Sequence, residues 1–585
     1  MRTRIWDHQD CDLDRAAELA RELGVEPIVA RLLLRRGLTD AETAWRFLNP
    51  TLDHLHDPLR LAGMIDARDR LRRAIAAGER IAVYGDYDVD GVTSTVILQR
   101  AIERLGGVVD HFIPHRLHDG YGLLPRTLDE LHASGVHVVV SVDCGIRGRE
   151  AAERARELGV DLIITDHHEP EHCLPPALAV VNPKREDCTY PDKNLAGVGV
   201  ALKLVQALLA GTEHARTLPA FVKMAAIGTI ADVVPLVGEN RVIAKLGLAE
   251  LSKGPHAQGL QALLDVTGLS GRRLDGYHVG FVLGPRLNAA GRMASPDLAS
   301  RLLLTSGAER APEARALAEQ LDEENSRRQV EEATIVAEAR RRIETWPDIG
   351  AHNMLVVAGE EWHRGVIGIV ASRLVDAFHK PAVVLSVQDG IAQGSCRSIP
   401  AFDMLGALER CADLLLKFGG HRQAAGLTLE AERVPELRAR LSAHADAVLE
   451  PEDLMPRLRI DEMLRLSAVT PALAGALDVL APFGPGNRRP VFSSAVEIVR
   501  GPDRLKDKHL TMTVRDDGRM LRAVAWRGVH HADLLAAHRA RLELAYTVET
   551  NTYRGETSLE LSVSDIRAPG GGPGGADPSP PLASP

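Results

Sequence analysis

The sequence predicts a multidomain α/β protein, in which a parallel-sheet domain is joined by a long helix to a second α/β domain and followed by a small β-barrel. Three observations support this fold class. Short apolar runs alternate with helical stretches from residue 80, residues 311–345 are densely charged with no glycine or proline after Pro312, and apolar and polar residues alternate beyond residue 455. A chain of 585 residues is also too long for one hydrophobic core, which predicts three or four domains.

Residues 1–75 are predicted to be an N-terminal helical segment, because their apolar residues recur at helical spacing. The first α/β domain is predicted at 76–310. It contains four apolar runs, at 80–84, 108–113, 136–142 and 161–165, with helical stretches between them. Strands and helices that alternate in this way predict a parallel sheet covered by helices.

A connecting helix is predicted at 311–347, and its pattern fits a surface helix within one domain as well as a helix between two domains. The second α/β domain is expected at 348–452, with strands at 354–358 and 382–387 and a helix at 366–378. From 453 to 568, segments such as 510–514, 542–548 and 559–563 have the period of half-buried antiparallel strands, which predicts a small barrel or sandwich. Residues 569–585 are rich in glycine, proline and serine and are expected to be disordered.

The composition is that of an ordinary globular protein, with 45% hydrophobic and 26% charged residues. No apolar run approaches the roughly 20 residues that a membrane span needs, and the charged N-terminal residues do not resemble a signal peptide. A cytoplasmic location without membrane association is therefore expected. Six scattered cysteines without a CxxC pair predict free thiols. The net charge of −10 does not indicate a nucleic-acid-binding protein, although a local basic groove is enough for binding.

Acidic and imidazole side chains follow three of the predicted strands at the point where each strand ends. The run GDYDVDG ends the first strand of the domain, SVDCG ends the third, and TDHH ends the fourth. Because ligands of open α/β sheets bind at the carboxyl ends of the strands, these side chains are expected to converge on one crevice. They are Asp86, Asp88, Asp90, Asp143, Asp166, His167 and His168.

Several carboxylates close together repel one another unless cations neutralise them. Carboxylate oxygens suit Mg²⁺ or Mn²⁺, and added imidazole ligands favour Mn²⁺. Two such ions about 4 Å apart can activate water and stabilise a leaving oxygen. Each motif alone has a simpler explanation, since an Asp-rich turn often only caps a helix and a His pair is often structural. Their joint occurrence at the ends of these strands favours a two-metal phosphoesterase site.

The motifs GDYDVDG, SVDCG and TDHH, in this order, resemble those of the DHH phosphoesterase superfamily. A fourth segment, GTIADVVPL, places Asp232 where the family has its last acidic ligand. The resemblance implies two divalent ions, Mn²⁺ or Mg²⁺, with Asp143 as the bridging ligand. It also implies that His168 contacts the scissile phosphate and that Asp166 orients a neighbouring imidazole, whereas Asp90 is expected to cap the following helix. The implied metal ligands are Asp86, Asp88, Asp143, His167 and Asp232.

Further segments extend the resemblance over nearly the whole chain. FGGHRQAAG, at 418–426, resembles the glycine-rich motif of the DHH-associated substrate domain, in which Gly420 and His421 are candidates for phosphate contact. GLTDAETAWRFLNP, GPRLNAAGRM, GSCRSIPAFD and APFGPGNRRPVF are similar to segments of the RecJ family of bacterial exonucleases. This similarity implies a single-strand-specific 5′→3′ DNA exonuclease that releases mononucleotides in repair and recombination. It also implies a single-strand-binding protein and a helicase as candidate partners.

The same resemblance implies which residues hold the DNA. Residues matching Arg116, Ser395 and Arg397 hold the 5′ end in RecJ-like proteins, which explains polarity. The segment GPRLNAAGRM has two basic and no acidic side chains, which suits phosphate contact. Its candidate contact residues are Arg286, Asn288 and Arg292.

The C-terminal β-rich segment resembles an OB-fold and is expected to hold single-stranded DNA. Phe492 or Trp526 is a candidate for stacking on bases, and the alternative that these aromatic side chains fill the barrel core is equally compatible with the pattern. The candidates for contact with the DNA backbone are Arg488, Arg489, Arg504, Lys506 and Lys508.

Alternative functions come from inside and outside the superfamily. A nucleotide or nanoRNA phosphodiesterase usually lacks the C-terminal barrel, and a pyrophosphatase needs a different second domain. A catalytically weak replication scaffold and a plain single-strand-binding protein both leave the intact acidic cluster unexplained. A zinc site at His111, His115 and His118 lacks matching cysteine or acidic spacing. Tyr84 stands where many relatives have a histidine two residues before Asp86, so the chain departs from the family pattern at the edge of the first metal site.

Overall fold

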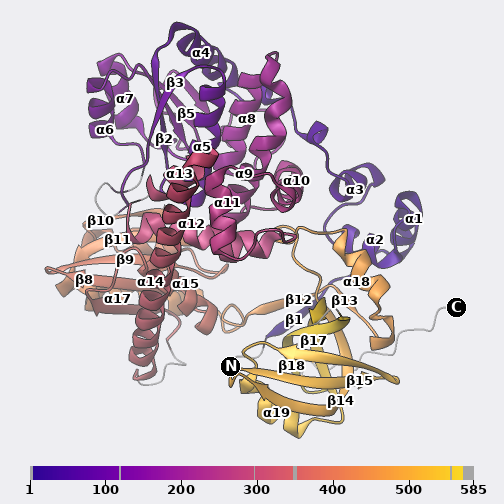
Figure 1. Cartoon of the computed structure of the whole chain (residues 1–585). Helices are drawn as coiled ribbons and strands as arrows, with labels where there is room; N and C mark the ends of the chain where they lie inside the picture. Colours follow the sequence, from indigo (N-terminus) through magenta and orange to yellow (C-terminus); the bar gives the residue numbers. More distant parts are fainter. Residues whose placement is uncertain are drawn as a thin grey trace. The chain divides into compact units, whose positions relative to one another are not determined.

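The computed structural model describes residues 4–116, 120, 122–295, 297–346, 352–553 and 556–570 (Figure 1). These residues divide into two compact units. One unit comprises residues 50–449 and 484–486, and the other comprises the residues up to 49, residues 450–483 and those from 487 onward. The first and last parts of the chain therefore belong to the same unit.

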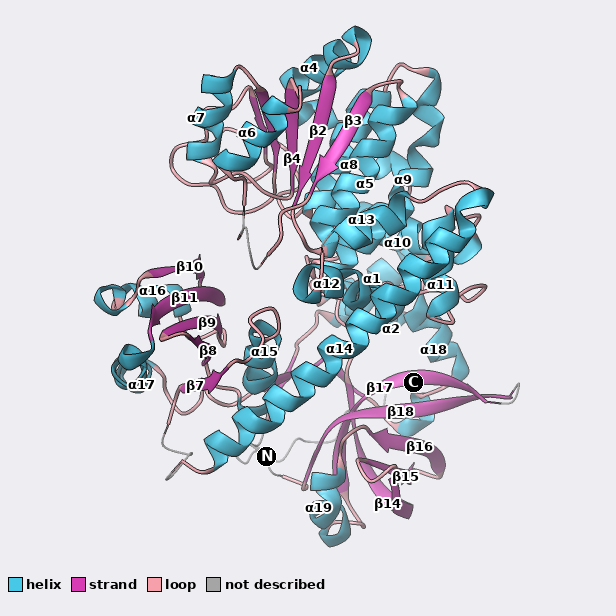
Figure 2. Ribbon diagram, turned by 60° about the vertical axis from the view of Figure 1, so that its left-hand side comes forward, coloured by secondary structure: helices cyan, strands magenta, loops and turns pink. Residues whose placement is uncertain are grey.

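The unit of residues 50–449 contains a five-stranded parallel sheet with helices on its two faces (Figure 2). Alternate strand residues point to opposite faces. Ile81 and Val83 lie in one core with α4 (Met64–Ala77), α5 (Val89–Arg104) and α8 (Gly197–Leu209), whereas Ala82 and Tyr84 lie in another with α6 (Pro125–Ala133) and α7 (Arg149–Leu158). This layered parallel sheet confirms the predicted fold class. In sheet order the strands are β3 (Val108–Phe112), β2 (Arg80–Gly85), β4 (Val138–Val142), β5 (Asp161–Thr165) and β6 (Ala179–Val181).

More helices extend the layer that contains α5 and α8. The first of them, α9, packs on α5 and α8 and ends at the residue before Asp232. These helices are α9 (Leu218–Ala231), α10 (Gly238–Lys253), α11 (Gln258–Val266), α12 (Gly284–Met293) and α13 (Asp297–Leu304).

The charged segment forms one 34-residue helix, α14 (Ala311–Glu344). It contacts α11, α12 and α13 and also the helix and strand that begin the second sheet domain. It therefore runs from one α/β domain to the next, which is one of the two arrangements left open by the sequence. The second sheet has the order β10 (Lys417–His421), β11 (Ala424–Glu430), β9 (Ile391–Arg397), β8 (Ala382–Gln388) and β7 (Leu355–Glu360), with helices α15 (Ile367–Phe378), α16 (Met404–Glu409) and α17 (Val434–Val448).

The other unit is built around a closed five-stranded barrel, because its first long strand, β14, pairs with both β15 and β17. This confirms the predicted C-terminal barrel. The barrel strands are β14 (Phe492–Leu505), β15 (His509–Asp516), β16 (Arg519–Ala525), β18 (Glu556–Arg567) and β17 (Leu542–Tyr553). The unit also contains β13 (Glu462–Met463), α18 (Pro471–Asp478) and α19 (Ala532–Ala537).

The N-terminal residues depart from the sequence expectation. Residues 1–75 were expected to be entirely helical, but β1 (Ile5–His8) is a strand that pairs in parallel with β12 (Arg457–Ile460). The helices α1 (Leu13–Leu23), α2 (Pro27–Leu34) and α3 (Ala41–Leu48) share one hydrophobic core with the barrel strands. A four-residue strand whose partner lies far along the chain has no local sequence signal, which is why the pattern missed it.

The C-terminal tail and the predicted absence of membrane-spanning segments are the last two features expected from the sequence. Residues 571–585 of the expected disordered tail lie outside the described residues. Among the helices that the structure describes, none combines the length and the apolar character required to cross a membrane.

Candidate metal centre

The loop after β2 brings two carboxylates to the carboxyl edge of the first sheet. Asp86 follows the strand directly and is buried, and Asp88 is half-buried at the start of α5. The Oδ1 atom of Asp88 accepts the backbone N–H groups of Asp90 and Gly91, so Asp88 caps this helix. A Cβ at Gly91 would lie 2.4 Å from the carbonyl oxygen of Asp86, so only glycine allows the loop to fold this tightly.

The loop after β4 holds Asp143 in an unusual conformation. Its φ of 61° is in the left-handed region, and its carboxylate is buried against the first turn of α8. The Nε2 atom of His167, which follows β5, lies 3.2 Å from Oδ1 of Asp143 and 3.8 Å from Oδ2 of Asp232. The structure thus brings side chains from the ends of β4, β5 and α9 to one point.

Three overlapping groups of side chains could each hold a cation, since their ligand atoms lie within 4.8 Å of one another. Asp143 belongs to two of these groups, as expected of a ligand shared between two ions. The groups are Asp86 with Asp88 and Asp143, Asp143 with His167 and His168, and Asp90 with His167 and Asp232.

The electrostatics of this cluster are those of a site that needs cations. Burial, and then neighbouring carboxylates, raise the pKa of Asp86 and of Asp143 well above the ordinary range and raise the pKa of Asp232 to about 9. Burial lowers the pKa of His167 to about 3, which keeps its ring neutral and available as a ligand. Four buried atoms of the cluster have no hydrogen-bond partner among the residues that the structure describes: Oδ1 of Asp86, Oδ1 of Asp143, Nε2 of His167 and Oδ2 of Asp232. Unpaired buried oxygen and nitrogen atoms of this kind fit divalent cations.

Asp166 and His168 form a coupled pair beside the cluster. A ring nitrogen of His168, Nδ1, lies 2.7 Å from Oδ1 of Asp166. The same carboxylate accepts the backbone N–H groups of His167 and Ile146. Although burial opposes ionisation, the bond from His168 leaves the pKa of Asp166 below its ordinary value, and the pKa of His168 is raised by the same bond. Asp166 thus holds the His168 ring in one orientation with a proton on Nδ1.

The structure corrects the expectation for Asp90. It does not cap the following helix, because Asp88 does. Instead, its two oxygens accept the backbone N–H groups of Gly197 and Val198, at the start of α8. Asp90 therefore joins α8 to the loop after β2 that holds Asp86 and Asp88, which is called the metal loop below. A pattern confined to neighbouring residues could not have shown this contact.

The structure also shows the surroundings of Tyr84 and of His111, a histidine of the alternative zinc site. Tyr84 is fully buried, and its hydroxyl donates to the carbonyl of Gly122. His111 lies against Asp297 and Ser300, and no candidate metal group of the described residues includes it. His118, the third residue of the zinc alternative, lies outside the described residues.

Three arginine side chains, Arg116, Arg292 and Arg397, form a cluster in which Arg116 is near both of the others. Arg116 is also near Asp86, and Arg292 is near Asp88. Burial, and then the charge of Arg116, lower the pKa of Arg292 to about 10, and burial together with Arg116 also lowers the pKa of Arg397. Arg397 donates to the hydroxyl of Ser395, and the guanidinium of Arg116 lies 4.9 Å from the ring centre of Tyr87. Like charges near one another favour an anion between them, and a phosphate group would supply one.

The remaining substrate candidates differ in their surroundings. Arg286 is held by Asp322 of α14, and Asn288 accepts the backbone N–H of Val89 at the start of α5. His421 is exposed in the β10–β11 hairpin, and after burial its pKa is lowered by Arg147 and by His168, so the hairpin lies near the metal cluster.

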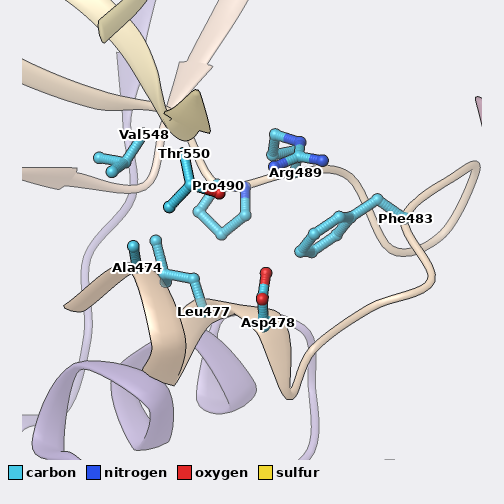
Figure 3. A pocket seen from close by; sticks show the side chains of 8 residues that line it. All are labelled: Ala474, Leu477, Asp478, Phe483, Arg489, Pro490, Val548 and Thr550. Atoms are coloured by element: carbon cyan, nitrogen blue, oxygen red, sulfur yellow. The ribbon is translucent and has the colours of Figure 1, made fainter. Parts of the chain in front are cut away.

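In the barrel unit, the structure decides between the two aromatic candidates. Phe492 is fully buried in the barrel core, so of the two alternatives left open for it by the sequence, the structure shows the core position. Trp526 is 53% exposed and packs against the edge of His509. Figure 3 shows a further aromatic residue, Phe483, whose ring faces the guanidinium of Arg489 at 4.8 Å beside a cavity of about 30 Å³. The five basic candidates of this unit are exposed: Arg488, Arg489, Arg504, Lys506 and Lys508.

Comparisons with known proteins identify related proteins over nearly the whole length of the chain. Three family models match it: the N-terminal domain of the DHH family at residues 80–229, the DHHA1 domain at 351–446 and the RecJ OB domain at 460–565. The chain is 39% identical over 567 residues to the single-stranded-DNA-specific exonuclease RecJ of Bacillus subtilis (strain 168), with 96% of this chain and 70% of that protein covered. It is 35% identical over 581 residues to RecJ of Escherichia coli (strain K12), with 95% and 98% covered.

A solved structure is also similar over the full length. The crystal structure of RecJ in complex with Mn²⁺ from Thermus thermophilus matches with a TM-score of 0.83 and 33% identity, and the match covers 99% of this chain and 82% of that chain. The RecJ structure with Mg²⁺ from the same organism matches with a TM-score of 0.78 and 31% identity, and that match covers 98% of this chain and 80% of that chain.

Proposed function

The chain belongs to the RecJ family of single-stranded-DNA-specific exonucleases, and we propose from this premise that it hydrolyses single-stranded DNA from the 5′ end and releases 5′-mononucleotides. The observation that carries the proposal is the set of four buried, partnerless ligand atoms at the carboxyl edge of the parallel sheet, in the same unit as the arginine cluster. The first feature suits two divalent cations, and the second suits a phosphate at the end of a strand. The alternatives outside the superfamily account for neither.

The proposed cation ligands are Asp86, Asp88, Asp143, His167 and Asp232. Two bound Mn²⁺ or Mg²⁺ ions supply Lewis-acid chemistry at a phosphoryl group and lower the pKa of a water molecule. His167 offers Nε2 as a neutral nitrogen ligand, because burial keeps its ring unprotonated. Asp143 is the proposed bridging ligand, and it is the one acidic residue of the set whose backbone has a positive φ.

Two further residues act on the phosphate without holding a cation. The bond from Nδ1 of His168 to Asp166 fixes the ring, so Nε2 is the nitrogen that faces the substrate in our proposal. The raised pKa of His168 favours the protonated ring, which can donate to an oxygen of the scissile phosphate.

The arginine cluster and Ser395 are proposed to hold the 5′ phosphate. Ser395 lies beside Arg397, and a Cβ at Gly368 would lie 3.0 Å from the Ser395 hydroxyl, so the first turn of α15 closes over this point. A phosphate bound here would present the first phosphodiester bond to the cations, which would give 5′→3′ polarity. Gly420 and His421 of the β10–β11 hairpin are proposed to contact the same nucleotide. Arg286 and Asn288 are proposed to support α12, which carries Arg292.

Single-stranded DNA is the proposed ligand of the barrel unit, with Trp526 and the exposed basic side chains as contacts. A single-strand-binding protein and a helicase are proposed partners, since hydrolysis of one strand requires that strand to be free. A DNA substrate also supports the proposal of a cytoplasmic location.

The proposal can be tested with purified protein and Mn²⁺. We expect 5′-phosphorylated single-stranded DNA labelled at the 3′ end to be shortened to mononucleotides, while duplex DNA is spared. Degradation from the 3′ end, or a preference for dinucleotides over longer DNA, would contradict the proposal. Asp143→Ala should abolish cleavage and leave DNA binding measurable, whereas the exposed Asp187→Ala serves as a matched control.

A further inference from the structure

Two large aromatic side chains are exposed on the helical segment that leads into α12. Tyr277 is 63% exposed and Phe281 is 71% exposed, and Phe281 exceeds every other large apolar side chain of the described residues. The two rings stack on each other, with centroids 5.2 Å apart and planes inclined by 23°. Isolated exposed apolar side chains need no explanation, but a stacked exposed pair is an ordered aromatic surface.

The backbone holds this pair outward. The segment His278–Leu283 is a π-helix, a form that is rare and is frequently found at functional sites. Val279 and Leu283 of this segment are fully buried, so the segment is anchored in the core. A Cβ at Gly284, the next residue, would lie 3.4 Å from Cβ of Ala231, so the π-helix ends against the last turn of α9.

The exposed pair is connected to the metal loop by one rigid element. The π-helix continues directly into α12, in which Asn288 accepts the backbone N–H of Val89. A Cβ at Gly291 would lie only 2.5 Å from the carbonyl oxygen of Tyr87, so the metal loop and α12 are in close contact. Asn288 follows Phe281 by seven positions, which corresponds to about 10 Å along a helix with a rise of about 1.5 Å per residue. The aromatic pair thus lies a short distance from the proposed site of hydrolysis.

The charges around the pair favour a polyanion. Arg272 and Arg273 are exposed shortly before Tyr277, and neither has an ion pair within the part of the chain that the structure describes. The nearest acidic residue in the sequence, Asp275, is engaged by His278 at 2.6 Å. Exposed aromatic rings, with arginines that have no ion pair four and five residues before the first ring in the sequence, are a combination suited to binding single-stranded nucleic acid.

We propose that Tyr277 and Phe281 form a stacking platform for a base of single-stranded DNA, with Arg272 and Arg273 contacting the adjoining phosphates. The inference rests on the proposed function and extends it, since it names a contact that orders the strand beyond the nucleotide at the metal centre. Every base has a flat aromatic face, so the platform would favour unpaired bases without selecting a sequence.

The first experiment measures stacking directly and needs no cleavage. Oligonucleotides with 2-aminopurine at successive positions are bound to the full-length protein in the presence of a chelator. We expect the fluorescence of one position to be quenched by the wild type and restored by Phe281→Ala and by Tyr277→Ala. If neither variant restores fluorescence at any position, the platform does not exist.

The second experiment measures the contribution to hydrolysis. Phe281→Ala should raise KM for single-stranded DNA by about 5-fold to about 150-fold, the range for loss of one base–aromatic stack, while kcat is retained. Phe281→Tyr should restore KM, and Val330→Ala, on the exposed surface of α14, is the matched control. An abasic nucleotide at the quenched position should weaken the wild type and leave Phe281→Ala unchanged.

Two further results distinguish base stacking from simple apolar contact and from a failure of the proposed nuclease activity. If Phe281→Leu behaves as the wild type in both experiments, apolar area rather than aromatic stacking is what matters, and the stacking platform is refuted. If the wild type does not cleave single-stranded DNA at all, the proposed function fails, and the fluorescence experiment still decides whether the platform binds bases.

Discussion

Replacing Gly197 by alanine should remove the activity, although alanine is the better helix former. Gly197 is the first residue of α8, and a Cβ at this position would lie 2.4 Å from Oδ1 of Asp143 and 2.7 Å from its Cβ. Ordinary contact begins near 3.4 Å, so the carboxylate must move by about 1 Å. Asp143 has little freedom to yield, because its φ is 61° and its N–H donates to the carbonyl of Thr165.

The magnitude follows from the tolerance of metal sites. Ligand distances in metal sites hold to within about 0.2 Å, so a shift of about 1 Å disrupts the proposed bridging position. A misplacement of about 1 Å costs about 100-fold in rate, or about 2.7 kcal/mol, even where no metal ligand moves. Stability should change much less, because overpacking costs about 1–3 kcal/mol and the gain from replacing glycine in a helix offsets up to about 1 kcal/mol of it.

The assay compares Mn²⁺-dependent hydrolysis of 5′-phosphorylated single-stranded DNA, Mn²⁺ affinity by calorimetry and thermal unfolding. The matched control is Gly475→Ala in α18, where a Cβ meets nothing within 4 Å and the residue is exposed. We expect the control to retain activity and Gly197→Ala to lose activity and Mn²⁺ affinity while it remains folded. If hydrolysis and Mn²⁺ affinity of folded Gly197→Ala equal those of the wild type, Asp143 is not the bridging ligand.

Three other predictions concern charge and packing. The pKa of Asp90 is raised to about 7 and that of Asp232 to about 9, so the folded protein without metal favours the protonated form of both side chains. In the presence of a chelator, the free energy of unfolding should therefore be greatest at acidic pH and should fall as the pH rises through those two values. The increase in Tm produced by Mn²⁺ should therefore grow between about pH 6 and about pH 9, and an equal increase at both would contradict this. Arg397→Ala should lower the preference for 5′-phosphorylated over 5′-hydroxyl DNA by about 10-fold or more in kcat/KM, since a hydrogen bond to a charged group contributes about 1.5–3 kcal/mol; an unchanged preference would exclude Arg397 from 5′-end binding. Phe492→Ala should cost about 3–5 kcal/mol in unfolding free energy, whereas Trp526→Ala should leave stability within about 0.5 kcal/mol and weaken DNA binding; the reverse result would show that the two roles were exchanged.

The residues at the ends of β2, β4 and β5 could be predicted from the sequence because strand period and parallel topology determine where they lie. Asp143 and His167 are brought within 3.2 Å by that topology alone. Asp232 could be found only by resemblance, since it follows α9, a helix from a distant part of the sequence that packs on α5 and α8 rather than on the sheet itself. Asp90 shows the same limit, because its partners Gly197 and Val198 lie more than a hundred residues away.

In the barrel unit, the sequence could not predict which aromatic side chains are buried and which are exposed. Phe492 and Trp526 both lie in or beside strands, and alternation alone does not say which side of a closed barrel is filled. The fold places Phe492 inside and leaves Trp526 exposed. The exposed pair of Tyr277 and Phe281 gave no sequence signal either, because their spacing of four is that of an ordinary buried helix face.

Ribosomes synthesise the chain from its N-terminus, so β1 and helices α1 to α3 emerge long before the strands that they pack against. Synthesis at about 5–20 residues per second puts the segment that contains β12 and the barrel about 20–80 seconds behind them. During that interval, the apolar faces of the three helices have no barrel to cover them, whereas the residues of both sheets in the unit at 50–449 are completed by its end. The unit at residues 50–449, which holds the proposed metal centre, can thus fold first. The unit that contains the barrel, which is proposed to bind single-stranded DNA, can fold only when translation is nearly complete.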